Sequence, residues 1–99
     1  MHEHGLAREL WPQLQQIAER QGLTKVTRVE MIVGMLHGVA ADFLAHSFAH
    51  AFKGTNFEGA TTDIQIVDPG DPLPKGASQP GSRVATGWEL VVTKIEGES

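Results

Sequence analysis

A stretch of twenty residues, 68–87, places the strongest limit on how this chain can fold. It reads DPGDPLPKGASQPGSRVATG, carries four of the five prolines, and shows no regular spacing of apolar residues. Proline cannot donate a backbone hydrogen bond and interrupts both helices and sheets. We therefore expect a long loop here, with all helices and strands formed by residues 1–67 and 88–99. A chain of 99 residues usually forms one domain, so residues 1–99 are expected to be a single domain.

Two segments have the apolar spacing of amphipathic helices. In the first, Leu6 to Gln21, leucines recur every four residues over the first turns. Pro12 lies inside this segment and predicts either a kink or a helix that restarts at the proline. The second segment, Ala40 to Lys53, ends with a lysine followed by Gly54, which is a typical C-terminal signal of a helix.

Three further segments are rich in β-branched residues and predict strands. They are Thr24 to Gly34, with one face expected to be buried, then Thr61 to Val67 and Trp88 to Glu96. Ile95 falls out of the alternation of the third segment, which predicts a bulge or a sharp twist between Val92 and Ile95. The order helix–strand–helix–strand–loop–strand predicts an α+β fold, with two helices packed on one face of a small three-stranded sheet.

Most of the large aromatic side chains are expected in the core. Phe43, Phe48 and Phe52 lie at helical spacing in the second predicted helix. This spacing favours core packing, or an apolar face that is shared with a partner. Trp11 in the first helix and Trp88 at the start of the last strand are both expected to be core aromatics.

Composition excludes several classes of site. The chain has no cysteine, which excludes disulfides, thiolate catalysis, iron–sulfur clusters and cysteine zinc sites. The net charge of −4 without a basic cluster argues against nucleic-acid binding. No apolar run reaches the roughly 20 residues that cross a bilayer, and no signal peptide is evident. Paired carboxylates and nucleophile–base pairs are not apparent either, so we expect a cytoplasmic protein that is not an enzyme and does not bind membranes.

The first four residues, MHEH, form a candidate set of metal ligands. The amine of Met1, together with the amide and imidazole of His2, can close fused chelate rings around one ion. A fourth nitrogen comes from the Glu3 amide or from the His4 ring. Four nitrogens in one plane suit Ni(II) or Cu(II) and suit Zn(II) poorly. The alternative interpretation is a solvated histidine at a frayed chain end.

Three other histidines are candidates for a secondary metal site. His46 and His50 are four residues apart on the second predicted helix, so they share a face, and His37 lies in the loop before that helix. The zinc-protease pattern fails because Ser47 follows His46 where a glutamate is required. The alternatives are two partly buried histidines packed beside the core, or a face that contacts a partner.

Four segments, in order, carry a family resemblance: MHE, KVTRVEMIVGMLHGV, AFKGTNFEGA and GWELVVTKIEGE. Together they resemble the HypA/HybF family of hydrogenase nickel-incorporation proteins. The resemblance implies that Ni(II) is held by the Met1 amine, the His2 imidazole and amide, and the Glu3 amide, and we expect His4 to supply an axial or exchange ligand. It also implies a nickel-handling GTPase and the large subunit of nickel–iron hydrogenase as partners, and in some organisms urease maturation.

The chain departs from this family at the 68–87 loop. Family members carry a zinc module of two CxxC pairs at this place, whereas QPGSR has Pro80 where a cysteine ligand is expected. No structural zinc is therefore expected, and residues 1–99 are predicted to form one nickel-binding domain with this loop in place of the zinc module. Two functions remain, a nickel metallochaperone and a non-catalytic adaptor that kept the protein-docking surface but lost metal delivery. The sequence is compatible with a homo-oligomer.

Overall fold

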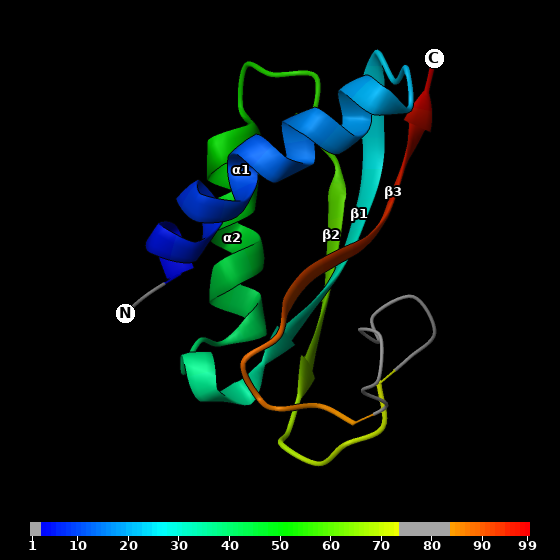
Figure 1. The fold of residues 1–99 in the computed structure, drawn as a ribbon. Helices are drawn as coiled ribbons and strands as arrows, with labels where there is room; N and C mark the ends of the chain where they lie inside the picture. Colours follow the sequence, from blue (N-terminus) through cyan, green and yellow to red (C-terminus); the bar gives the residue numbers. More distant parts are fainter. Residues whose placement is uncertain (1–2, 74–83) are drawn as a thin grey trace.

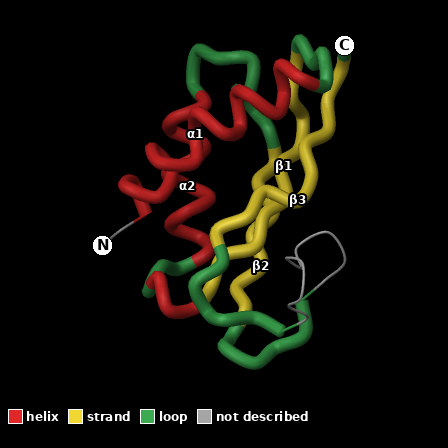
Figure 2. Tube along the Cα trace, in the orientation of Figure 1, coloured by secondary structure: helices red, strands yellow, loops and turns green. Residues whose placement is uncertain are grey.

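The computed structural model describes residues 3–73 and 84–99. The elements are α1 (Glu3–Arg20), β1 (Lys25–Gly34), the 3-10 helix η1 (Met35–His37), α2 (Ala41–Phe52), β2 (Thr61–Val67) and β3 (Leu90–Glu98). The two helices cross each other on one face of the sheet, which confirms the predicted α+β fold and element order (Figures 1 and 2). Within the described ranges, no helix has the length and apolar character needed to cross a membrane.

β1 is the central strand of the sheet, which has the order β2-β1-β3. It pairs in parallel with β2 and antiparallel with β3. Parallel neighbours need a crossover connection, and α2 lies within that connection. Along β3 the pairing steps from Lys94 to Val92 between consecutive residues of β1. Thr93 is therefore the extra residue, and the bulge predicted between Val92 and Ile95 is confirmed.

α1 begins earlier than predicted and does not restart at the proline. It starts at Glu3 rather than Leu6 and continues as one helix through Pro12. Leu10 and Leu14, on either side of the proline, are completely buried. The burial of these side chains offsets the loss of the backbone hydrogen bond that the proline cannot donate, because each buried leucine stabilises the fold by about 1.5–3 kcal/mol.

The core lies between the helices and the sheet. Its largest completely or almost completely buried members are Leu10, Leu14, Val26, Val29, Met31, Val33, Leu44, Phe48, Phe52 and Phe57. Trp11 packs against this core, with ring centroids 4.9 Å from Phe57 and 5.6 Å from Phe52. The prediction of Trp11 as a core aromatic is therefore confirmed.

Trp88 is not a core residue, so this prediction is wrong. Its side chain is 60% exposed. β3 begins only at Leu90, so Trp88 lies outside the strand alternation that turns Leu90 toward the helices. Phe43, in the first turn of α2, is 61% exposed, which excludes the core interpretation for this residue and leaves the apolar face.

Among the described residues, a small apolar cluster covers one end of the sheet face opposite the helices. There Ile32 is 2% exposed and packs with Val67 and Ala85, with Leu73 beside them. The prediction that only one face of the first strand is buried is therefore wrong at this end. Val67 directly precedes the predicted loop, and Leu73 and Ala85 lie within it. No periodic pattern in the sequence connects these residues with Ile32.

The two ends of the predicted loop are joined by backbone hydrogen bonds. The Gly70 N–H donates to the Ala85 carbonyl at 2.8 Å, and the Ala85 N–H donates to the Asp71 carbonyl at 2.7 Å. Pro72 and Val84 form an isolated bridge beside them. Residues 68–73 and 84–87 form no helix or strand, as predicted, whereas residues 74–83 lie outside the described residues.

A close backbone contact joins the end of β1 to the chain that returns toward β3. The Gly34 N–H donates to the Glu89 carbonyl at 2.8 Å, and the Leu36 N–H donates to the Gly87 carbonyl at 2.9 Å. A side chain at Gly34 would collide with the backbone of Gly87, whose φ of 93° itself favours glycine. This contact fixes η1 and the position of Trp88.

Candidate metal centre

The structure describes two of the four predicted N-terminal ligands. Met1 and His2 lie outside the described residues, and Glu3 and His4 are the first residues of α1. Glu3 is 8% exposed, and its Oε2 accepts a hydrogen bond from the Ala40 N–H at 3.4 Å. The carboxylate thereby connects the start of α1 to the residue before α2, and these two helices lie side by side (Figure 1). The predicted nickel ligand is a different atom of this residue, its amide nitrogen.

His4 lines a surface hollow between the two helices. The hollow has a volume of about 370 Å³, and its lining includes His4, Arg8 and Trp11 from α1 and Ser47 and His50 from α2. Ser47 is 4% exposed, whereas the two histidines are exposed. His4, from the predicted N-terminal ligand set, and His50, from the predicted secondary site, therefore line the same hollow.

His46 and His50 are both exposed, so the interpretation as partly buried residues beside the core is wrong. The cause is the face that α2 buries, which consists of Leu44, Ser47, Phe48 and Phe52. The two histidines lie off this face. Of the two, only His50 lines the hollow with His4.

His37 makes contacts with a different part of the chain. Its Nε2 lies 3.0 Å from the carbonyl oxygen of Trp88, and its ring meets the Trp88 ring edge-on, with centroids 5.4 Å apart. The structure therefore does not bring His37, His46 and His50 to one place. In ranges 3–73 and 84–99, no three His, Asp or Glu side chains gather into a group that could hold a metal ion.

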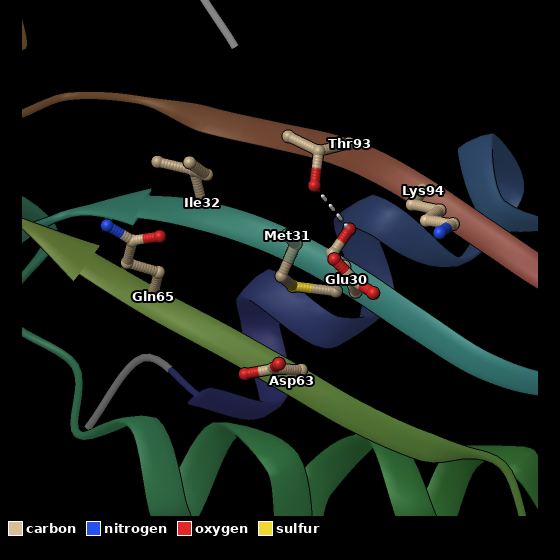
Figure 3. A pocket seen from close by; sticks show the side chains of 7 residues that line it. All are labelled: Glu30, Met31, Ile32, Asp63, Gln65, Thr93 and Lys94. Carbon is tan, nitrogen blue, oxygen red and sulfur yellow. Dashed lines mark hydrogen bonds between the residues drawn. The ribbon is translucent and has the colours of Figure 1, made fainter. Parts of the chain in front are cut away.

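A second hollow lies on the open face of the sheet (Figure 3). Its volume is about 240 Å³, and it is lined by Glu30, Met31, Ile32, Asp63, Gln65, Thr93 and Lys94. The Thr93 hydroxyl donates to the backbone carbonyl of Glu30 at 3.2 Å, so the bulge residue is tied to β1. None of the lining residues forms the nucleophile–base pair that catalysis in such a hollow would require.

Arg28 pairs with the carboxylates of this open face. Its Nε lies 3.0 Å from Glu30 and its Nη2 lies 2.7 Å from Asp63. The hydrogen bond with Glu30 raises the pKa of Arg28, and the charges of Glu30, Asp63 and Glu96 also raise it, against a lowering by desolvation. These carboxylates form a surface ion-pair cluster with the guanidinium.

Glu89 organises the turn that precedes β3. Its carboxylate accepts hydrogen bonds from the Thr86 N–H at 2.8 Å, the Gly87 N–H at 3.0 Å and the Thr86 hydroxyl at 3.2 Å. Partial burial acts to raise the pKa of Glu89, but the hydrogen bonds from Thr86, from its own backbone and from Gly87 together lower it below the ordinary value. The turn holds Trp88 beside His37.

Local sequence patterns do not pair His4 with His50. His4, Arg8 and Trp11 are four and three residues apart, so they form one stripe along α1, and Ser47 and His50 form a short stripe on α2. Each stripe is visible in the sequence. That the two stripes face one hollow depends on how the helices cross, for which the sequence contains no direct signal.

The residues that line this hollow lie in the part of the chain that matches a known protein family. Residues 1–70 match the family model described as "Hydrogenase/urease nickel incorporation, metallochaperone, hypA". The match covers α1, β1, η1, α2 and β2 and ends at the start of the predicted loop. The matched segment includes MHEH and all the other histidines.

Individual relatives match over the same region. The hydrogenase maturation factor HypA of Nitrosospira multiformis is 38% identical over 65 residues, which is 66% of this chain and 56% of the relative. That of a Roseiflexus species is 37% identical over 67 residues, or 68% of this chain and 54% of the relative. The matched segment thus spans little more than half the length of these relatives.

The fold is similar to that of a solved relative. The solution structure of the Ni metallochaperone HypA from Helicobacter pylori matches with a TM-score of 0.69 and 17% identity, covering 100% of this chain and 99% of that chain. At this identity the likeness concerns the fold. The family is described by metal incorporation and not by catalysis, in agreement with the prediction that the chain is not an enzyme. The resemblance inferred from the sequence is confirmed, and the chain belongs to the HypA family of hydrogenase and urease nickel-incorporation proteins.

Proposed function

We propose that this chain is a nickel metallochaperone that binds Ni(II) through its N-terminus and passes it to a partner during hydrogenase maturation. One observation carries the proposal. The family match begins at residue 1, so the segment that it shares with a nickel-incorporation family contains the MHE ligand set. The nickel ion is the cargo of this function.

The proposed ligands are the Met1 amine, the His2 amide and imidazole, and the Glu3 amide. Binding removes the protons of the two amides, so the charges of the ligands cancel the charge of the ion. This matters because the N-terminus of α1 carries a partial positive charge that disfavours a bare cation. The loss of protons also makes the affinity rise with pH. His4, exposed and next along the chain, is the proposed axial or exchange ligand.

An exposed site at a chain end suits delivery. Each nitrogen can be replaced in turn by a ligand of the receiving protein, and the amides regain their protons as the ion leaves. We propose a nickel-handling GTPase and the large subunit of nickel–iron hydrogenase as partners, with urease maturation as a second route. A GTPase partner places this work in the cytoplasm, where GTP is available. The description of the family as hydrogenase and urease nickel-incorporation proteins supports these partners.

Calorimetric titration of the untagged protein with Ni(II) tests the proposal. We expect about one tightly bound ion per chain, and a loss of affinity of about 100-fold or more in His2→Ala or when Gly-Ser precedes Met1, because each change removes chelating nitrogens. His46→Ala, which removes an exposed imidazole outside the proposed ligand set, is the matched control and should bind as the wild type does. Unchanged affinity in either N-terminal variant contradicts the proposal.

Structural zinc is not part of the proposal. The chain contains no cysteine, so it cannot supply the four thiolates of the usual zinc module, and we propose that the 68–87 loop stands in its place within one domain. We expect the same melting temperature with and without EDTA in a thermal unfolding experiment. A decrease of several degrees would demonstrate a structural metal, since such metals contribute directly to folding.

Exposed apolar side chains support the adaptor as a second candidate. Met35, Leu36 and Trp88 are 47%, 43% and 60% exposed, and they lie around the contact between η1 and the segment before β3. An adaptor would use such side chains to bind a partner. If the chain is an adaptor, the His2→Ala variant still supports hydrogenase maturation and the Trp88→Ser variant does not. If it is a metallochaperone, the His2→Ala variant does not support maturation.

A further inference from the structure

The hollow between α1 and α2 joins two imidazoles that the sequence separates by 46 positions. His4 and His50 both line it, and both are exposed, so a dissolved ion can reach them without opening the fold. Ala7 and Ser47, which also line the hollow, are 3% and 4% exposed. Small buried side chains at these positions leave room between the larger residues of the two helices.

The walls of the hollow are held by the core. Trp11, another lining residue, packs against Phe52 at 5.6 Å and against Phe57 at 4.9 Å. This contact fixes α1 against the end of α2, because the aromatic rings on both sides are part of the core. The two imidazoles are therefore carried by helices whose relative position is set by packing and does not depend on a ligand.

We propose that His4 and His50 form a second metal site, which binds a divalent ion such as Ni(II) through one imidazole nitrogen from each helix. Imidazole suits Ni(II), Cu(II) and Zn(II), and water can complete the coordination in an open hollow. Ser47 lies within the same lining and can hydrogen-bond to a bound water. The site shares His4 with the proposed function, where it is the axial or exchange ligand, but it uses none of the nitrogens of Met1, His2 or the Glu3 amide. The pairing of His4 with His50 goes beyond the proposed function.

Arg8 sets the strength of this site. Arg8 lines the same hollow, and the positive charge of an arginine side chain repels a bound cation. The hollow should therefore bind Ni(II) more weakly than a planar set of four nitrogens. Arg8→Gln should raise the affinity of the hollow by about threefold, a size expected for a charge that is exposed to solvent and salt.

The two kinds of site differ in the spin state of Ni(II). Four nitrogens in a square plane give a diamagnetic ion, whereas two imidazoles and several waters give an octahedral, paramagnetic ion. NMR of the full-length His2→Ala chain, titrated with NiCl₂, isolates the hollow. We expect the ring signals of His4 and His50 to broaden together along one binding curve, while those of His46 stay sharp.

Matched variants in the same His2→Ala chain complete the test. His50→Gln should abolish the broadening at His4 and lower the Ni(II) affinity by about 10-fold, because one of two protein ligands is lost. His46→Gln, on the same exposed helix surface but outside the hollow, should change neither quantity. The proposal is overturned if His50 broadens without His4, if His46 broadens equally, or if His50→Gln binds unchanged. A failure of the N-terminal site appears separately, as tight binding that survives His2→Ala.

Discussion

The two faces of the sheet differ in what covers them, although β1 supplies residues to both. Toward the helices, Val29 and Val33 are completely buried in the core. On the opposite face, Arg28 and Glu30 form a half-exposed ion pair, and Ile32 is buried near the end of the strand. The same strand is thus part of a continuous core on one face and of a charged surface on the other. The helices, and not the strand sequence, determine where most of the stability lies.

The largest expected effect is on the helix-covered face. Phe48→Ala should lower the free energy of unfolding by about 3–5 kcal/mol, because Phe48 is completely buried and its removal leaves a cavity. Phe43→Ala, the same change on the same helix at a residue that is 61% exposed, should cost less than about 0.5 kcal/mol. Urea denaturation measures both. Similar losses in the two variants would show that the core does not lie where the structure places it.

An intermediate effect is expected at the covered end of the opposite face. Ile32→Ala should lower the free energy of unfolding by about 2 kcal/mol, at the low end for a buried isoleucine, because its cluster is small and can partly collapse. Urea denaturation with intrinsic tryptophan fluorescence is a suitable measurement. A loss below about 0.5 kcal/mol would mean that the segments around Leu73 and Ala85 do not cover this residue in solution.

A smaller effect concerns the turn that leads this cover into β3. Glu89→Gln should cost at most about 1 kcal/mol at neutral pH, because water screens the partly exposed carboxylate. Folding lowers the pKa of Glu89 from its ordinary value of 4.5, so its stabilisation is present above that value and is lost as the pH falls below it. Unfolding curves between pH 3 and 7, on a roughly unit-spaced series, should therefore show wild type and variant converging at low pH. A difference that stays constant with pH would contradict this role.

The smallest effect is expected at the ion pairs of the open face. Arg28→Gln should leave the midpoint of urea denaturation almost unchanged, because exposed ion pairs contribute little once side-chain entropy and screening are counted. Any difference that remains should shrink in high salt. A large loss that persists in high salt would show that this face is covered in solution, and the contrast between the two faces would then fail.

Sequence patterns could predict the helices and strands that bury their apolar side chains on one face. The leucine spacing of α1 and the phenylalanine spacing of α2 gave the helices, and alternation gave the strands, since each pattern reflects a single buried side. Even the bulge at Thr93 was visible, because Ile95 broke the alternation. These features depend on neighbours within the same segment.

The sequence could not predict features that depend on distant segments. Ile32 is buried by residues at 67, 73 and 85, and Trp88 is exposed because β3 starts two residues later than its pattern suggests. The placement of His4 and His50 around one hollow likewise follows from the crossing of the helices. In each case the deciding contact joins positions that no local period connects.

The hydrogen bonds between Asp71, Gly70 and Ala85 have a consequence for how this family can change. They bring the departing and returning chain to a single attachment point, outside the layer where helices and sheet pack. The entropy of closing a loop grows only slowly with its length, so the span between these residues can lengthen or shorten at little cost. Whole modules can thus be gained or deleted there during evolution, while the helix pair that bears the histidines keeps its geometry.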